Sequence, residues 1–249
     1  GLHVLVEKPL ALASKEIDEL AKLAESNGKV LGVNHNMVFH PEVVRLRDEV
    51  AQRKLGRVEH ANVVHNVPLR QLGTGDVSHF MFQSPGRILL EQAVHPISIL
   101  HALLGPVLDA QVTTGPPRTL ANGRTFFDTW NISMQHERGT SHALLAFGRD
   151  LIEQTLQVIG TDGAARIDLQ HGSYLPVRKT KWLEFFDNAW HGMAGGVGLV
   201  KSGMATAARY PMGLFRVTKL PDRFFQGIGG SIADFHAALR ARREPTNNV

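Results

Sequence analysis

A lysine stands where an apolar stretch near the start of the chain gives way to polar residues. The run Leu2–Val6 is mostly apolar and rich in valine, which predicts a buried strand, and Glu7-Lys8-Pro9 follows it directly. A lysine at a strand end can hold a substrate hydroxyl as a fixed positive charge, and burial can lower its pKa enough for proton transfer. An ordinary solvated lysine that closes a strand would give the same pattern.

Glu91 and His95 form a second candidate pair. They are four residues apart in sequence, so on a helix both side chains would reach the same pocket. Histidine titrates near neutrality and suits general acid or base catalysis on an alcohol. Pro96 places the start of the helix close to His95, because proline is tolerated only in the first turn. A local carboxylate–imidazole pair without a substrate is the alternative.

The residues around Lys8 predict a βαβ unit. After the first strand, apolar residues recur at helical spacing, at Ile17, Leu20, Ala21 and Ala24. A second short strand, Val30–Val33, ends at the polar residues Asn34 and His35. Strand, helix and strand in this order favour parallel strands, and ligands gather beyond the carboxyl ends of such strands. Asn34 and His35 are therefore candidates for substrate contact, together with Lys8.

The rest of the chain has a different pattern, with many strands separated by turns. Helices are predicted at 41–54, 93–104 and 231–242, and strands at 58–67, 107–113, 127–135, 141–147, 154–159 and 165–169. Alternation of buried and polar positions in 130–135 indicates a strand with one wet face. We therefore expect a parallel α/β part followed by an α+β domain with a large, mainly antiparallel open sheet.

Composition excludes several classes of protein and site. The chain has no cysteine, so disulfides and thiolate chemistry are excluded, and a reducing compartment is permitted. We expect a cytoplasmic location. No apolar run approaches the roughly 20 residues of a membrane-spanning helix. The net charge of +4 is modest and the basic clusters are short, so no nucleic-acid partner is predicted. The histidine pairs lack a matched third ligand, so no metal site is predicted.

Five short motifs, in order along the chain, resemble the Gfo/Idh/MocA family of oxidoreductases, which includes glucose–fructose oxidoreductase and inositol dehydrogenase. They are His3–Ala11 with its E-K-P core, Gly32–His35, Leu55–Val58, Gly86–His95 and Gly160–Gly163. The resemblance implies a Rossmann domain that binds NAD or NADP, and a second domain whose large sheet binds substrate and often forms the oligomer interface. We accordingly expect residues 1–36 to be the C-terminal remnant of the Rossmann domain and residues 37–249 to be the α+β substrate-binding and oligomerisation domain.

The resemblance also implies roles for individual residues. Lys8 is implied to be the catalytic lysine, with a cis bond to Pro9, and Glu7 to lie near the nicotinamide ribose, so Glu7, Lys8 and Pro9 are expected to contact cofactor. His95 is implied to be the proton-transfer residue, with Glu91 where the family usually has aspartate. The implied reaction moves a hydride between nicotinamide and a carbinol of a sugar, a cyclitol or a sugar derivative.

Two features depart from the family pattern. Glutamate in place of aspartate at position 91 adds a methylene group, and the G-x-G-x-x-G turn that binds a dinucleotide does not occur within residues 1–249. We therefore expect these residues to be one piece of an enzyme, to bind nicotinamide cofactors weakly and to be inactive alone. A non-catalytic sugar-binding or scaffolding member of the same family is the alternative, and intact Lys8 and His95 argue against it. An isolated basic interaction domain has no positive support.

Overall fold

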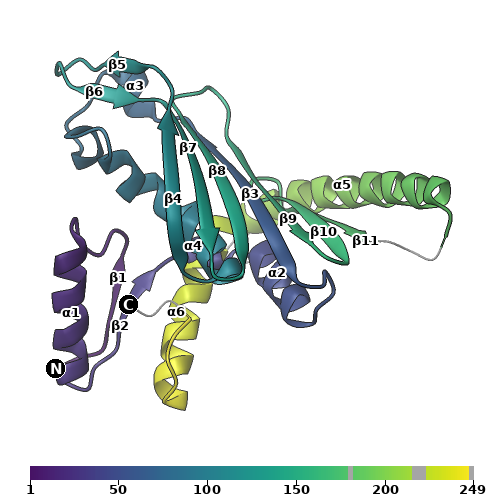
Figure 1. The fold of residues 1–249 in the computed structure, drawn as a ribbon, viewed down its shortest axis with the longest axis horizontal. Coiled ribbons are helices and arrows are strands. Elements are labelled where there is room, and N and C mark those ends of the chain that lie inside the picture. The colour runs from purple at the N-terminus through teal and green to yellow at the C-terminus, as the bar shows by residue number, and fades with distance from the viewer. Residues whose placement is uncertain (179–181, 215–222, 247–249) are drawn as a thin grey trace.

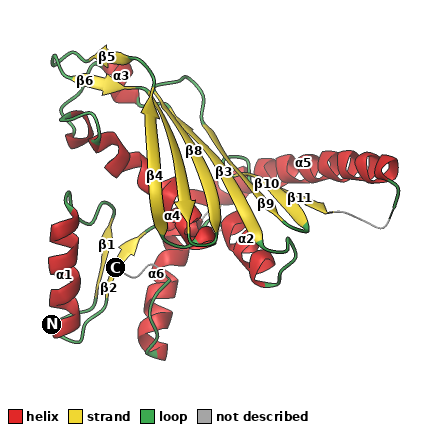
Figure 2. Cartoon of the chain, in the orientation of Figure 1, coloured by secondary structure: helices red, strands yellow, loops and turns green. Residues whose placement is uncertain are grey.

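Two sheets of very different size organise the chain (Figure 1). The computed structural model describes residues 1–178, 182–214 and 223–246. A two-stranded parallel ribbon near the N-terminus lies apart from a seven-stranded sheet, and helices and loops join them (Figure 2). A small hairpin of β5 (Pro117–Thr119) and β6 (Thr125–Phe127) stands beyond one end of the large sheet.

The N-terminal ribbon confirms the βαβ unit. Strand β1 (Val4–Glu7) pairs in parallel with β2 (Leu31–Asn34), and helix α1 (Ser14–Ser26) connects them. The register pairs Glu7 with Asn34, so both polar strand ends lie side by side. The strand begins later than the sequence pattern predicts, and Leu2 is 84% exposed. Leu2 precedes Val4, the first residue that pairs with β2, so it lies outside the paired part of the ribbon.

The short 3₁₀ helix η1 (Asn36–Phe39) and helix α2 (Pro41–Ala51) connect the ribbon to the large sheet. Pro41 occupies the first helical position, where its missing N–H costs nothing. The side chain of His40 caps α2 by accepting a bond from the Glu42 N–H at 3.3 Å, and its other ring nitrogen contacts the Leu169 carbonyl at 3.1 Å. These contacts attach the start of α2 to the sheet.

The large sheet has the strand order β11-β10-β9-β3-β8-β7-β4. Its strands are β3 (Val58–Val67), β4 (Val107–Thr114), β7 (Thr129–His136), β8 (Gly139–Phe147), β9 (Glu153–Gly160), β10 (Gly163–Asp168) and β11 (Ser173–Arg178). Only β3 and β8 are parallel neighbours, so the prediction of a mainly antiparallel sheet is confirmed.

One face of this sheet forms the core. Trp130, Ile132 and Met134 alternate with more exposed residues along β7, as the sequence pattern predicts. Helix α4 (Val94–Leu104) packs against β3 and β8, and its residues Ile99 and Leu100 are fully buried. A turn of π-helix, η3 (Leu89–Ala93), leads directly into α4. Helix α3 (Arg70–Thr74) and the 3₁₀ turn η2 (Phe80–Phe82) precede it.

Two long helices complete the described chain. Helix α5 (Glu184–Leu214) projects from the β11 end of the sheet, and α6 (Arg223–Ala241) returns to the ribbon (Figure 1). Helix α5 was not predicted from the sequence, because its many glycines lower helix propensity. Helix α6 packs on η1 and β2, with the ring of Phe235 against Gly32. Within the described residues, no helix combines the length and the apolar character needed to cross a bilayer.

Candidate functional site

A cavity of about 320 Å³ lies between the end of β1, the π turn, β3 and α6. Three residues singled out in the sequence line it together: Lys8, Glu91 and His95. Glu7 lines it as well, with its carboxylate Oε1 accepting a bond of 2.5 Å from the Asn34 amide. The structure therefore brings the strand-end lysine and the Glu91–His95 pair to one place.

Lys8 is held by Glu91 through two contacts. Its Nζ donates to the Glu91 backbone carbonyl at 2.7 Å and to carboxylate Oε1 at 2.8 Å. The two side chains are only 12% and 22% exposed, so water screens this ion pair less than a surface pair. The Lys8–Pro9 peptide bond is cis, as the resemblance implies. Lys8 is thus an oriented ammonium group and not a solvated surface lysine.

The π turn explains why the Glu91 carbonyl can accept this bond. In a π turn, the carbonyl of one residue accepts from the N–H five residues later. For Glu91 that residue is Pro96, which has no N–H. Pro96 therefore cannot donate the π-type bond to the Glu91 carbonyl, and Lys8 donates a hydrogen bond to that carbonyl. The prediction that the α-helix starts close to His95 is confirmed, since α4 begins at Val94.

His95 lies in a buried, electropositive environment. Burial, followed by the positive charge of Lys8 and the neighbouring His65 and His35, lowers the pKa of His95 to about 3. Its Nδ1 is buried and has no hydrogen-bond partner in the part of the chain that the structure describes. The imidazole is therefore neutral near pH 7, and it can accept a hydrogen bond or a proton from a bound hydroxyl group.

Several neutral polar side chains that were not among the residues predicted from the sequence also line the cavity. His65 on β3 is 3% exposed, and its ring lies 6.4 Å from that of His95 between centroids. It contacts Gln92 Oε1 and Gln154 Nε2 at long distances of 3.5 Å each. Asn36 lines the cavity too, with Nδ2 buried and without a partner among the described residues. A histidine on the core face of the predicted strand 58–67 was the available signal.

The predicted substrate contacts Asn34 and His35 lie beside this cavity. Asn34 is buried and holds Glu7, while its Oδ1 has no hydrogen-bond partner in the described chain. His35 lines an adjacent cavity of about 620 Å³ with Ser98 and His101. Burial and the nearby His101 and Lys8 lower the pKa of His35. Of the polar residues that end β2, Asn36 is the one that lines the cavity with Lys8.

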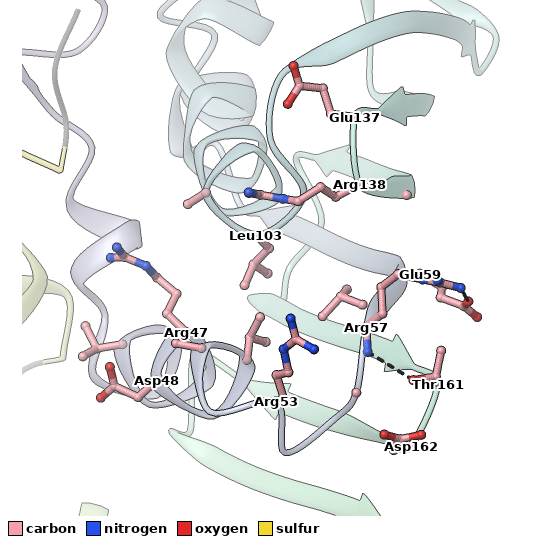
Figure 3. Close-up of a pocket in the computed structure, with 17 residues that line it drawn as sticks. Arg47, Asp48, Arg53, Arg57, Glu59, Leu103, Glu137, Arg138, Thr161 and Asp162 are labelled. Carbon is pink, nitrogen blue, oxygen red and sulfur yellow. Dashed lines mark hydrogen bonds and ion pairs between the residues drawn. The ribbon is translucent and has the colours of Figure 1, made fainter.

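A larger groove of about 1270 Å³ lies elsewhere, between α2, α4 and the β7–β8 and β9–β10 turns (Figure 3). Its charged side chains are Arg47, Arg53, Arg57, Arg138, Asp48, Glu59, Glu137 and Asp162. These charges balance, and Arg57 already pairs with Glu59 at 2.7 Å. The groove is open and its charged groups are largely solvated, whereas buried titratable groups meet in the smaller cavity.

Two family models match the chain. The model of the GFO/IDH/MocA C-terminal domain matches residues 43–166. A model of an oxidoreductase family with an NAD-binding Rossmann fold matches residues 1–35. The two matches do not overlap and follow the order expected for a Rossmann segment and a sheet domain.

Similar proteins include enzymes that act on sugars. The chain is 32% identical over 108 residues to dTDP-3,4-didehydro-2,6-dideoxy-α-D-glucose 3-reductase from Streptomyces violaceoruber, covering 43% of this chain and 31% of the relative. It is 33% identical over 107 residues to 1,5-anhydro-D-fructose reductase from Ensifer adhaerens, covering 42% and 31%. An Agrobacterium radiobacter oxidoreductase, solved with NAD⁺, L-tartaric acid and magnesium, shares the fold with a TM-score of 0.69 at 12% identity, covering 99% of this chain and 65% of that structure. The chain thus spans about a third of the length of the Streptomyces violaceoruber and Ensifer adhaerens reductases.

Proposed function

Because the chain belongs to the GFO/IDH/MocA family of oxidoreductases, we propose that the full protein is an NAD(P)-dependent dehydrogenase that acts on a carbinol of a sugar, a cyclitol or a sugar derivative. One observation carries this proposal. An ammonium group fixed by Glu91 and a neutral imidazole line the same small cavity, at the carboxyl end of a parallel strand. Oxidation of an alcohol requires both a group that stabilises the oxygen and a proton acceptor.

The strand ends fit a polar cofactor. Asn34 Oδ1 and Asn36 Nδ2 are buried there without hydrogen-bond partners among the described residues, which suits a ligand with its own donors and acceptors. We assign Glu7, Lys8 and Pro9 to the nicotinamide end of NAD or NADP. When bound, that cofactor supplies the hydride acceptor or donor.

The protein residues handle the oxygen and its proton. Lys8 would bind the reacting hydroxyl oxygen and stabilise the negative charge that develops on it. His95 is unprotonated at neutral pH and would accept the hydroxyl proton. Glu91 orients the Lys8 ammonium group through its two contacts. In this proposal, Glu91 acts through Lys8 and not through the His95 imidazole.

The cavity lining supports an uncharged, hydroxylated substrate. Asn36, Gln92 and Gln154 offer amide groups that can donate to and accept from sugar hydroxyls. The cavity contains one cationic lysine, and that lysine is already paired with Glu91. We propose Asn34 and His35 as further contributors to substrate binding. For Asn34 the effect would pass through Glu7, whose carboxylate it holds.

We also propose the division of the protein into a Rossmann part that ends at residue 36 and an α+β domain from residue 37, together with oligomer formation through the outer face of the large sheet. The row Asn62, His142 and Gln157 crosses the middle of that face and is half-buried. An interface there would be polar and hydrated. Replacing His142 by Glu should lower the molar mass seen by light scattering, and an unchanged mass would contradict this arrangement. A cytoplasmic location stays a prediction.

A kinetic screen tests the main proposal. The full protein is incubated with NAD⁺ or NADP⁺ and a panel of neutral sugars, cyclitols and sugar nucleotides, and formation of the reduced cofactor is followed. Lys8→Met should lower the rate with any active substrate by roughly a hundredfold or more, whereas Lys15→Met, which alters an exposed lysine on α1, should leave it unchanged. Turnover in the Lys8→Met protein close to that of the unaltered protein would contradict the catalytic assignment and favour the scaffolding alternative.

A further inference from the structure

Helix α5 directs its apolar side chains towards solvent and away from the rest of the protein. Six apolar residues that share one face of the helix are between 50% and 68% exposed: Phe186, Trp190, Met193, Val197, Val200 and Met204. We call these residues the α5 seam. The helix projects beyond the edge of the large sheet for most of its length (Figure 1). An apolar surface of this kind on a soluble domain marks a site of interaction.

The opposite side of α5 is attached to the protein by polar contacts. Ser202 Oγ donates to the carbonyls of His171 and Gly172, at 2.8 and 3.0 Å. Gly198 lies on the same side, because a Cβ there would meet the Leu175 side chain at 3.0 Å. At roughly 100° per residue, Ser202 and Gly198 face away from the seam. The small and polar side of α5 thus faces the protein, which reverses the arrangement of an ordinary surface helix.

The seam residues are spaced alternately by four and three positions, which is the heptad spacing of a coiled coil. A helix with that spacing presents a straight apolar stripe to one partner helix. We propose that this partner is α5 of a second copy of the protein, packed against the first as an antiparallel coiled coil. The proposal is independent of the catalytic function assigned above.

The sizes of the seam side chains favour the antiparallel direction. Antiparallel pairing about residue 195 places Phe186 opposite Met204, Trp190 opposite Val200, and Met193 opposite Val197. The largest side chains then face smaller ones, and each layer has a similar volume. Parallel pairing would place Trp190 against Trp190 and Val197 against Val197, so that some layers would be crowded and others loose.

The residues beside the seam support the same register. On one flank, Asp187 of each copy lies opposite Lys201 of the other copy, so a negative side chain faces a positive one at both ends of the pair. On the other flank stand Ala189, Gly196 and Gly203. A Cβ at Gly196 or Gly203 would meet no atom within 4 Å, so this flank is open to a second backbone. One flank therefore offers charge complementarity, and the other allows the helices to approach closely.

The exposed area is sufficient for a specific contact. The α5 seam exposes on the order of 500 Å² of mostly apolar surface per copy, and its flanks bring the area towards the roughly 800 Å² per partner of a standard interface. Burial would also stabilise a helix whose interior glycines weaken it.

Two neighbouring residues provide a matched test. Val200 lies on the seam and Leu199 does not, yet both are apolar and similarly exposed, at 62% and 54%. We expect Val200→Glu to halve the molar mass of the full protein in light scattering and Leu199→Glu to leave it unchanged. Circular dichroism checks that both variants keep their helix. Equal masses for Val200→Glu and the unaltered protein would overturn the proposal, as would an equal loss of mass in both variants.

Disulfide trapping tests whether the two α5 helices pair in antiparallel direction. The chain has no cysteine of its own, so introduced cysteines form the only disulfides. Phe186→Cys and Met204→Cys proteins, mixed and mildly oxidised, should form a covalent dimer that neither forms alone. Positions 186 and 204 lie about 27 Å apart along the helix. In an antiparallel pair of identical variants, the two cysteines would be separated by this distance, which is too far for a disulfide. Cross-linking of either variant with itself would show a parallel pair and overturn the register. Failure of the mixture to cross-link would overturn the contact.

Discussion

The Lys8 ammonium group binds both the backbone carbonyl and the carboxylate of Glu91, at 2.7 and 2.8 Å. The two residues are 83 positions apart in sequence, so this double contact joins the end of β1 to the π turn before α4. One contact depends on the Glu91 side chain and the other on the backbone. Side-chain substitutions at position 91 therefore remove only half of the attachment.

Glu91→Gln should reduce kcat by roughly tenfold, less than the loss of a positioned acid–base group. The amide oxygen keeps a hydrogen bond to Lys8 but loses the charge, and the carbonyl contact remains. Glu91→Ala should cost more, because Lys8 then keeps the backbone contact alone. Steady-state kinetics of the unaltered protein, Glu91→Gln and Glu91→Ala measure these losses of kcat. A Glu91→Gln protein as slow as Lys8→Met would show that Glu91 has a role beyond holding Lys8.

Lys8 and His95 should act on one hydroxyl group. Lys8→Met and His95→Asn should each lower kcat by roughly a hundredfold or more. If the two groups work as a unit, the double variant should be barely slower than either single one. Cofactor titration must first show that each variant still folds and binds. Losses that multiply in the double variant would show that the residues act independently.

The pH dependence of kcat/KM should lack a histidine inflection near 6.5. His95 has a pKa of about 3, against 6.5 for an unperturbed ring, so it stays neutral in mildly acidic solution. Lys8→Met should move the acid limb to higher pH, since removal of a positive charge favours the protonated ring. The residual activity of the Lys8→Met protein, followed as a function of pH, shows in which direction the acid limb moves. A fall in kcat/KM centred near pH 6.5 in the unaltered protein would mean that the His95 ring is solvated.

Local sequence signals were sufficient for the parts of the site that lie within one element. The strand-end lysine, the helix start before Pro96 and the buried stripe of β7 each depend on residues close together in the chain. The contact of His65 with Gln154 depends instead on pairing between β3 and β9, where these two residues are direct register partners. No periodic pattern specifies which strand lies beside which, so this side of the cavity could not be predicted.

The π turn and α5 were missed for different reasons. The π turn is a local deviation from regular helix that no periodic pattern indicates, and its carbonyl contact to Lys8 joins residues far apart in sequence. Helix α5 contains glycines at 192, 195, 196, 198 and 203, which favour loops in any propensity-based prediction. The α5 seam can be recognised in the sequence only once residues 184–214 are known to form a helix.

The stability of the protein should fall with acid earlier than its carboxylates require. Burial lowers the pKa of His65 to about 4, below its value of 6.5 in the unfolded chain. As the pH falls below 6.5, the unfolded state takes up this proton and the native state does not, so His65 lowers the free energy of unfolding by about 1.4 kcal/mol per pH unit. His65→Gln should reduce the slope of the free energy of unfolding against pH by that amount between about pH 6 and pH 5. Denaturant unfolding measures it, with the exposed His236→Gln as control; equal slopes in both variants would contradict the burial of His65.

Gly227 controls how closely α6 approaches the cavity. A Cβ at this position would lie 2.5 Å from the Asn36 carbonyl oxygen, so alanine cannot fit unless α6 or η1 moves. Asn36 lines the cavity and Phe224 of α6 lines it from the other side, so that movement would widen the site. We expect Gly227→Ala to destabilise the protein by about 1–3 kcal/mol and to raise KM more than it lowers kcat.

A second glycine provides the control for this last prediction. Gly192 also lies within a helix, but a Cβ there would meet no atom within 4 Å. Gly192→Ala should therefore stabilise the protein, by up to about 1 kcal/mol, because alanine favours a helix over glycine. The same chemical change would then have opposite signs at the two sites, which separates close packing from helix propensity. Thermal unfolding and KM of both variants test it, and a Gly227→Ala protein with unaltered KM would show that α6 does not shape the cavity.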